Sequence, residues 1–319
     1  MTINRRALLG RVAAVGAAAA VGSALAPAAA QAAYWRERLT GADLDTKHRW
    51  QVGGGIVFDS AARVAGNGRA PELMHNGHNG VGIDGLWEVT VIPNDGISFP
   101  GTGRQLVSYM SIENWASAGQ AGPHWKSRYA GLAYSDNGND FVRTPLKWWH
   151  NGANTDPFQM WTTQRDGDWV YVFSVRSGRQ GGPMMLRRVR WDRLFHPESY
   201  EGWGCNGSDW GWGRPGTPIL TGRFGEPPVR RLADGTWVMS YLNCATGCIV
   251  TRTATGPDRV WTVEKVQVTS WQEPKLYGGF THPWSSRAAN DLHLMVSKWT
   301  RTPDDRSTAY HVSQFVATA

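Results

Sequence analysis

Cysteine is scarce in this sequence. Its 319 residues include three cysteines, Cys205, Cys244 and Cys248. A structural zinc site normally needs four nitrogen or sulfur ligands, and no second cysteine pair is present, so we expect no metal and no other cofactor. Cys244 and Cys248 flank a short Ala-Thr-Gly segment typical of a hairpin tip. A Cys244–Cys248 disulfide is therefore expected if the chain is exported, with Cys205 competing for either partner.

Charge is also limited. Only 18% of the residues are charged, and no block of like charges occurs. The net charge is +7, of which three arginines in residues 1–32 supply three, so residues 33–319 carry +4. The basic stretch 187–190 fits the face of a strand better than a stripe for nucleic acid. Nucleic acid is excluded as an expected partner, and we expect a monomer.

Long apolar runs are missing outside the N-terminus. An Ala-rich run spans residues 12–26, follows the paired Arg5 and Arg6, and precedes a small-residue cleavage site. This order is typical of a twin-arginine export signal. Because the run is short for a stable membrane span, we expect residues 1–32 to be removed, with a retained anchor as the alternative. The protein is then expected to be secreted or held in the cell envelope, as a single domain of residues 33–319.

Tryptophan and glycine are abundant instead, with 18 and 38 residues. Tryptophan fills β cores and also forms flat platforms for ligands. Trp203, Trp210 and Trp212 lie in the Trp/Gly segment 201–216. They are candidate substrate-binding residues that would stack on sugar rings, and the alternative is that they close the fold.

Strand-like runs recur in pairs along the chain. The first strands of the pairs are expected at residues 105–110, 169–175, 237–242 and 292–297, and the second strands at 130–135, 184–190, 248–254 and 309–315. The first strands start 64, 68 and 55 residues apart, and helical periodicity is almost missing. Recurrence of sheet-like units predicts an all-β, five-bladed β-propeller, the fifth blade coming from residues 50–95. A two-sheet sandwich or two small β domains are the alternatives.

Isolated polar residues near expected strand starts are candidates for catalysis. These are Glu226, Asp156, His282, Asp84 and Glu88. A proline directly follows the first three, fixes its own backbone and pushes the residue before it towards extended geometry. We therefore expect rigidly held side chains at the mouth of the propeller channel.

Glycoside hydrolysis needs two carboxyl groups, one acting as acid and the other as base or nucleophile. The apolar neighbours of Glu226 favour a raised pKa, which predicts that Glu226 is the acid. Asp84, Glu88 or Asp59 is expected to be its partner. Asp156 would orient a group or tune Glu226. The nucleophile elbow G-x-S-x-G does not occur, so Ser-His-Asp catalysis is not supported.

Three segments in the second half of the chain form the motifs of a known family: RFGEPPVRRLADGTWVMSYLN, IVTRTATGPDRVW and LYGGFTHPWS. They resemble the secreted actinobacterial five-bladed propeller family first catalogued as a domain of unknown function. Some of its members are endo-D-arabinanases, glycoside hydrolases that cleave the D-arabinofuranose chains of mycobacterial arabinan. The resemblance covers roughly residues 50–300. The chain departs from many members in blade one, where it reads GGGIVFDS and GIDGLWEV.

The resemblance implies roles for particular residues. Glu226, His282 and the turn 278–280 are implied as parts of the site. The other residues of that last segment, Tyr277, Phe280 and Trp284, are then expected to bind substrate. More distantly, Asp156 is similar to the aspartate of an Asp-Pro segment that assists the acid in other five-bladed furanosidases.

These observations support three hypotheses of function. The first is a secreted glycoside hydrolase that acts on arabinofuranose-containing cell-envelope polysaccharide. The second is a carbohydrate-binding propeller without catalysis, and the third is a structural or interaction propeller of the envelope. A polysaccharide is the expected partner in the first two.

Overall fold

The computed structural model describes residues 43–44, 50–51, 78–99, 102, 104–115, 125–136, 141–144, 149–282, 285, 292–301 and 308–318. The expected export signal, Asp59 and Trp284 lie outside the described residues. Most of the segment expected to form a fifth blade lies outside them as well.

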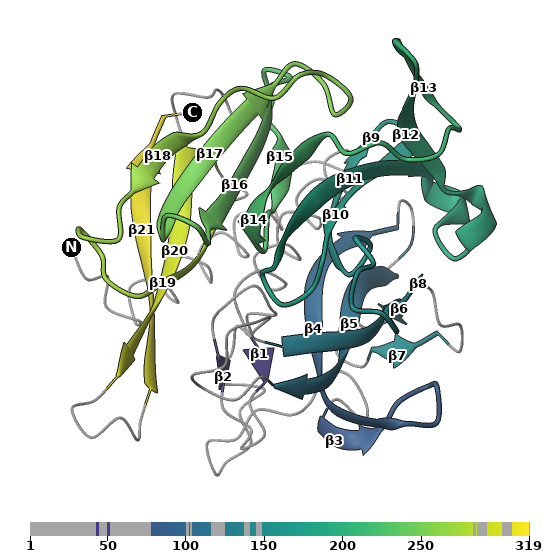
Figure 1. The fold of residues 1–319 in the computed structure, drawn as a ribbon, viewed down its shortest axis with the longest axis horizontal. Helices are drawn as coiled ribbons and strands as arrows, with labels where there is room; N and C mark the ends of the chain where they lie inside the picture. The colour runs from purple at the N-terminus through teal and green to yellow at the C-terminus, as the bar shows by residue number, and fades with distance from the viewer. Residues whose placement is uncertain are drawn as a thin grey trace, which may run out of the picture.

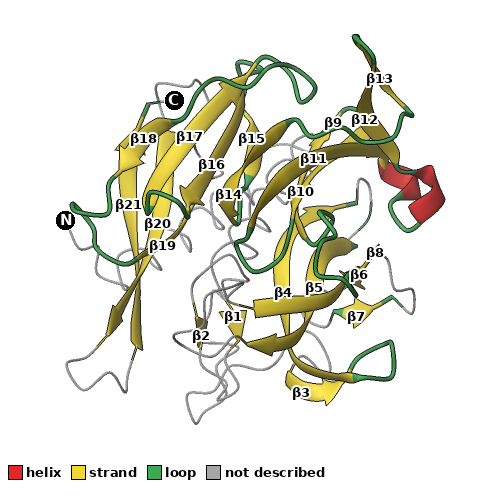
Figure 2. Cartoon of the chain, in the orientation of Figure 1, coloured by secondary structure: helices red, strands yellow, loops and turns green. Residues whose placement is uncertain are grey.

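The described chain is all-β (Figure 1; Figure 2). Its only helical elements within these ranges are two short 3₁₀ turns, η1 (Trp191–Arg193) and η2 (Pro197–Ser199). No helix among the described residues is long and apolar enough to cross a membrane. The strands form four antiparallel sheets of two, six, ten and three strands.

Each sheet is a run of strands that follow one another closely in sequence. The two-stranded sheet contains β1 (Asp43–Leu44) and β2 (Trp50–Gln51). The six-stranded sheet contains β3 (His78–Val81), β4 (Trp87–Ser98), β5 (Gln105–Trp115), β6 (Trp125–Ser135), β7 (Val142–Arg143) and β8 (Trp149–His150). The three-stranded sheet contains β19 (Leu276–Thr281), β20 (Leu292–Arg301) and β21 (Thr308–Ala317).

The ten-stranded sheet combines two such runs, joined where β11 pairs with β14. The first run contains β9 (Met160–Asp166), β10 (Trp169–Val175), β11 (Gly181–Arg190), β12 (Glu201–Asn206) and β13 (Asp209–Trp212). The second contains β14 (Leu220–Gly225), β15 (Val229–Arg231), β16 (Trp237–Asn243), β17 (Cys248–Ala254) and β18 (Lys265–Val268).

All four expected strand pairs are confirmed as antiparallel neighbours. They are β5 with β6, β10 with β11, β16 with β17 and β20 with β21. Their β-branched and aromatic residues are largely buried, as in β16, where Trp237 is 1% exposed and packs edge-on against Tyr171 of β10. Burial of such side chains at about 25 cal/mol per Å² provides the main stabilisation of the core between the sheets.

One further strand precedes each expected pair in its sheet. We call these four the leading strands: β4, β9, the broken strand β14/β15, and β19. The sequence placed the β4 region in a separate fifth blade, and this assignment is wrong. β4 pairs with β5 from Thr90↔Ile112 to Ser98↔Gln105, so it leads the same sheet as the pair that starts at residue 105.

Side-chain hydrogen bonds link the leading strands β4, β9 and β15 to one another, and link β19 to β16. The Thr163 amide of β9 donates to Asp95 of β4, and the Val229 amide of β15 donates to the hydroxyl of Thr162. The Ser240 hydroxyl of β16 donates to the Gly279 carbonyl of β19. These links bring residues that are far apart in sequence to one place, where the candidate site is found.

Candidate active site

Three leading strands are interrupted by an extra residue on the same side of the molecule. In β4 the ladder steps from Pro93 to Asp95 while β5 advances by one, so Asn94 is extra. In β19 the extra residue is Tyr277. Between β14 and β15, residues 226–228 face two residues of β16. Such bulges redirect side chains out of a ladder and are common beside active sites.

The bulges open onto one pocket. It is lined by Asn94, Asp95, residues 160–162 of β9, residues 226–228, residues 278–280 of β19, and Ser297 of β20. Glu226 and Asp95 are therefore two carboxyl groups in a single, otherwise largely apolar, cavity.

Glu226 is held in a conformation that the sequence did not predict. Its φ is 50°, in the left-handed region, whereas the following proline favours an extended backbone. The expectation of extended geometry is therefore wrong. Arg179, in the loop between β10 and β11, also has a left-handed φ of 55°. Non-glycine residues in this region typically cost about 1–3 kcal/mol each and cluster at functional sites.

The two oxygens of Glu226 have different surroundings. Oε1 accepts a hydrogen bond of 3.0 Å from Nη2 of Arg179, while the buried Oε2 has no hydrogen-bond partner among the described residues. The Glu226 side chain is 15% exposed. Burial raises the pKa of Glu226 above its usual range, and the charge and hydrogen bond of Arg179 oppose that shift. The carboxyl thus has one anchored oxygen and one able to carry a proton.

Arg179 is itself fixed by a third element. Its guanidinium carbon lies 3.8 Å from the centre of the Tyr277 ring in β19. A guanidinium over an aromatic face is attracted by the ring quadrupole. Arg179 therefore links Glu226 to β19 and holds Oε1 in place.

Asp95 has the opposite environment. It is 2% exposed, and its oxygens accept hydrogen bonds from the Gly96 and Thr163 amides and from the Thr162 hydroxyl, at 2.8 to 2.9 Å. Nη1 of Arg230 lies 3.8 Å away. Every one of these close partners is a donor or a cation, so the carboxyl group is held in place from several sides.

Gly278 lies beside the unpartnered oxygen of Glu226. A Cβ at this position would lie 3.9 Å from Oε2 of Glu226 and 3.3 Å from the hydroxyl of Ser297. A methyl group here would fill the space in which a substrate atom could approach Oε2. The small side chain is thus a requirement of the pocket.

Gly278→Ala is expected to raise KM or lower kcat by roughly tenfold, since misplacement of about 1 Å can cost up to 100-fold in rate. The backbone at Gly278 needs no positive φ, so thermal stability should change little. Hydrolysis kinetics and thermal unfolding of both proteins test this expectation. Gly181→Ala is the matched control, because the nearest atom to its added Cβ is Cγ of Arg223, at 3.5 Å. Equal kinetics for the two variants would contradict the proposed role.

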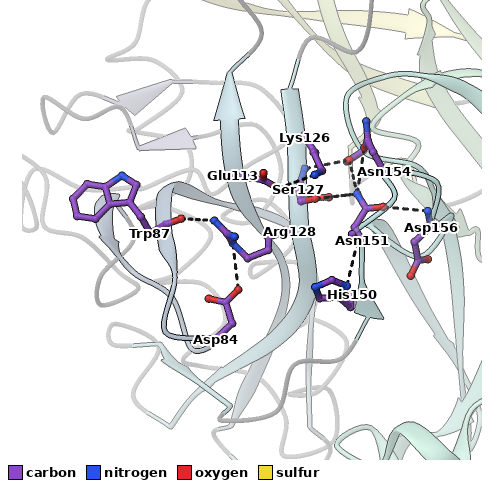
Figure 3. Close-up of polar contacts among 12 residues, drawn as sticks. Asp84, Trp87, Glu113, Lys126, Ser127, Arg128, His150, Asn151, Asn154 and Asp156 are labelled. Atoms are coloured by element: carbon purple, nitrogen blue, oxygen red, sulfur yellow. Dashed lines mark hydrogen bonds and ion pairs between the residues drawn. The ribbon is translucent and has the colours of Figure 1, made fainter.

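The expected partners of Glu226 are engaged elsewhere. Glu88 is fully buried, accepts a 2.6 Å hydrogen bond from Ser111, and forms an ion pair with Arg143. Asp84 pairs with Nε of Arg128 at 3.2 Å (Figure 3). Neither is among the described residues that line the pocket with Glu226. The described acidic residue that lines the pocket together with Glu226 is Asp95, which sequence reasoning did not select.

Asp156 lies in the loop before β9 and is not among the described lining residues either. Its amide donates to the side chain of Asn151, and its Oδ1 accepts from the Phe158 amide at 2.6 Å (Figure 3). Burial raises the pKa of Asp156, while Phe158 and the charge of Arg187 oppose the shift. The structure shows no contact with Glu226 through which Asp156 would tune that acid.

The Trp/Gly segment forms the β12–β13 hairpin, and β13 is an edge strand of the ten-stranded sheet (Figure 1). Trp203, Trp210 and Trp212 share one face, where Trp203 stacks on Trp210 with centroids 5.9 Å apart. The glycines lie on the other face, where a Cβ on Gly204 would be 1.9 Å from the carbonyl oxygen of Pro215. None of the three tryptophans is among the described pocket residues. Trp203 and Trp212 pack on the core instead.

The third expected segment reaches the pocket in part. Phe280 lines it, and Tyr277 approaches it through Arg179. His282 follows β19, and its amide donates to the His293 carbonyl at 2.7 Å. His282 is not among the described lining residues.

The expected disulfide is not formed. Cys205, Cys244 and Cys248 are all free thiols. Cys248 pairs with Asn243 across the hairpin, so Cys244 lies in the turn rather than opposite Cys248. Its sulfur faces the backbone of Gly225, where an added Cβ would be 3.1 Å away. Among the described residues, no group of three or more His, Cys, Asp or Glu side chains could hold a metal ion.

Sequence comparison places the chain beside proteins of unknown activity. A family model described as "Domain of unknown function (DUF4185)" matches residues 20–316. The chain is 57% identical over 271 residues to notoamide biosynthesis cluster protein J' of Aspergillus versicolor, which covers 83% of this chain and 73% of that protein. It is 55% identical to notoamide biosynthesis cluster protein J of an Aspergillus species, over 83% of this chain and 71% of that protein.

Among solved structures, a glycosyl hydrolase from Bacteroides ovatus aligns with a TM-score of 0.41 at 13% identity. The alignment covers 71% of this chain and 66% of that one.

Proposed function

The chain belongs to the family described as a domain of unknown function, DUF4185, and we propose that it is a secreted glycoside hydrolase acting on arabinofuranose-containing cell-envelope polysaccharide. The observation that carries the proposal is the pocket that holds both Glu226 and Asp95. Hydrolysis of a glycosidic bond needs two carboxyl groups whose environments differ. The surroundings of these two carboxyl groups differ: one oxygen of Glu226 has no partner among the described residues, whereas both oxygens of Asp95 accept hydrogen bonds.

Glu226 acts as the proton donor in this proposal. Its Oε2 is buried, has no partner among the described residues, and belongs to a carboxyl whose pKa is raised by burial. The protonated oxygen donates to the glycosidic oxygen as the bond to the leaving group breaks. Arg179 keeps Oε1 occupied, so the proton resides on Oε2, the oxygen without a partner among the described residues.

Asp95 acts as the second carboxylate. Its oxygens accept hydrogen bonds from the Gly96 and Thr163 amides and from the Thr162 hydroxyl, which fix the position of the carboxyl group. It either activates a water molecule or attacks the anomeric carbon itself. Retaining enzymes separate the two carboxyls by about 5 Å and inverting enzymes by about 6.5–9.5 Å.

We infer that the described sheets are blades of a five-bladed propeller. Support comes from the repeated order of a leading strand followed by a hairpin, and from the links among β4, β9 and β15. In such a fold the leading strands surround the channel, and the site takes a residue from each of several blades.

The proposed substrate and location rest on other features. The described lining residues include no lysine or arginine, which suits a neutral sugar such as arabinofuranose. The motifs within residues 223–285 resemble those of a family in which some members are endo-D-arabinanases, and the N-terminal 32 residues have the pattern of an export signal.

Purified protein incubated with mycobacterial arabinogalactan tests the proposal. Release of arabinose-containing oligosaccharides is expected, measured by chromatography and mass spectrometry. Binding without any release would overturn hydrolysis and favour a non-catalytic carbohydrate-binding propeller. One observation favours this second function. Asp95 is buried and its oxygens already accept hydrogen bonds from protein donors, as expected for a structural carboxyl group.

Replacement of Arg179 by glutamine is expected to move the basic limb of the pH profile of kcat/KM to higher pH. The active form has Glu226 protonated, so activity falls as pH rises through the pKa of Glu226. Arg179 favours the ionised form, and its loss raises that pKa further. Arg188→Gln is the control, since Arg188 pairs with Glu201 outside the pocket. A basic limb that stays in place or moves to lower pH would contradict this assignment.

A further inference from the structure

The seam between β4, β9 and β15 is joined at Thr162. These leading strands do not pair with one another in a backbone ladder. The hydroxyl of Thr162 bridges them, because it donates to Oδ2 of Asp95 at 2.9 Å and accepts from the Val229 amide at 3.1 Å. The Thr162 side chain therefore contacts both β4, which carries Asp95, and β15, which follows Glu226.

The direction of both hydrogen bonds is fixed by chemistry. A hydroxyl has one proton and two lone pairs, and a backbone amide can only donate. The Val229 amide therefore occupies a lone pair of Oγ1, and the single proton of Thr162 is directed to Asp95. Thr162 is 3% exposed, so water does not readily replace either bond.

The bridge reaches Glu226 through a stiff connection. Val229 follows Glu226 by three residues, and Pro227 and Pro228 lie between them. Proline fixes its own φ, so displacement of Val229 is transmitted along this segment. The position of Val229 relative to Thr162 thus influences where Glu226 stands relative to Asp95.

Other contacts hold Asp95 but do not make this link. The Thr163 amide donates to Oδ2 at 2.8 Å, and the Gly96 amide donates to Oδ1 at 2.9 Å. Farther along β9, the side chain of Gln164 accepts from the Arg231 amide at 3.2 Å. That contact ties β9 to β15 without contacting either acid.

We propose that Thr162 is a positioning residue, whose hydroxyl directs a proton at Asp95 and sets the placement of Asp95 relative to Glu226. The roles given to the two acids rest on the proposed hydrolase function. The hydrogen-bonded geometry that defines the bridge does not.

The test compares Thr162→Val with Thr162→Ser in the full-length protein. Valine keeps the shape and loses the hydroxyl, whereas serine keeps the hydroxyl. One measurement is the titration of the Asp95 carboxyl carbon by NMR, which needs no substrate. Another is the pH profile of kcat and KM on arabinogalactan. Thr144→Val is the control for loss of a buried hydroxyl, since Thr144 bonds the Leu132 carbonyl in another sheet.

Thr162→Val is expected to move the titration of Asp95 and the acid limb of activity upwards by about one pH unit, because a donor to the ionised form is lost. We expect kcat to fall about tenfold or more, with a smaller change in KM. Thr162→Ser should return the titration of Asp95 and the acid limb of activity to the wild-type position, and should return kcat to within about threefold of the wild type. Thr144→Val should change none of these quantities.

Other outcomes are equally decisive. A Thr162→Val protein with wild-type titration and wild-type pH profile would overturn the proposal. If the valine variant does not fold, Thr162→Cys, which keeps a compact side chain with a weak donor, replaces it and the same shifts are expected. If the wild type shows no turnover, the hydrolase function fails, and the Asp95 titration alone decides whether Thr162 positions that carboxylate.

Discussion

Glu226→Gln is expected to lower kcat/KM on arabinogalactan at least about 100-fold, the usual minimum effect of losing a general acid. Glutamine has the same shape, and its carbonyl oxygen can still accept the hydrogen bond from Arg179. Its amide cannot transfer a proton to the leaving oxygen. Polysaccharide binding should persist, so the defect is expected mainly in kcat.

The same substitution has an expected signature in stability. The folded-state pKa of Glu226 is raised, so the folded protein holds this proton more tightly than the unfolded chain. The free energy of unfolding therefore decreases as pH rises from the usual pKa of a glutamate to the raised value. Glu226→Gln should remove this dependence, which urea unfolding at several pH values measures.

A matched control is Glu201→Gln, which alters another arginine-paired glutamate at the edge of the sheet. It should retain turnover within a few-fold. Full activity of Glu226→Gln would show that the acid lies elsewhere and would remove the central role of the pocket.

The strand pairs could be read from the sequence because their residues alternate and end in turn signals. Buried β-branched and aromatic runs predicted β10 and β17 with their observed bounds. Three leading strands gave no such signal. The leading strand β19, for example, reads LYGGFT and contains two glycines, so its identity depends on packing against β16 rather than on propensity.

Of the two described acidic residues that line the pocket, the sequence analysis selected Glu226 but not Asp95. Glu226 was found because the two prolines after it mark a rigid segment, although its left-handed φ was not expected. Asp95 was missed because residue 95 was taken only as the end of the segment expected to form a fifth blade. A proline followed by Asn-Asp-Gly inside a strand-like run is a signal for a bulge, and that signal identifies Asn94 and Asp95.

Two of the expected acids, Glu88 and Asp84, form ion pairs away from the pocket. Glu88 and Asp84 were chosen as acids near a strand start, without knowledge of the cations that face them. The partners Arg143 and Arg128 come from later strands, and long-range pairing of this kind has no local sequence signal. Sequence spacing therefore identified acids but not which of them are already neutralised.

Asp95→Asn is expected to reduce turnover by at least about 100-fold and, unlike Glu226→Gln, to destabilise the fold. In the wild type, the Thr162 hydroxyl and the Thr163 amide both donate to Oδ2 of Asp95. Asparagine presents to these donors either its NH₂ group, which cannot accept, or its amide oxygen, which is a weaker acceptor than a carboxylate. A buried donor left without an acceptor costs about 1–3 kcal/mol in the free energy of unfolding. Urea unfolding and hydrolysis kinetics measure the two effects.

Asp84→Asn is the matched control for this second acid. Asp84 lies in the turn between β3 and β4, is paired with Arg128, and was one of the three partners expected from the sequence. If the pocket assignment is correct, Asp95→Asn is nearly inactive while Asp84→Asn keeps turnover within a few-fold, with some loss of stability. If Asp84→Asn is nearly inactive and Asp95→Asn keeps its turnover, the second catalytic carboxyl is Asp84, and Asp95 has only a structural role. Because the two variants change the same chemical group, their difference reports position relative to Glu226 and little else.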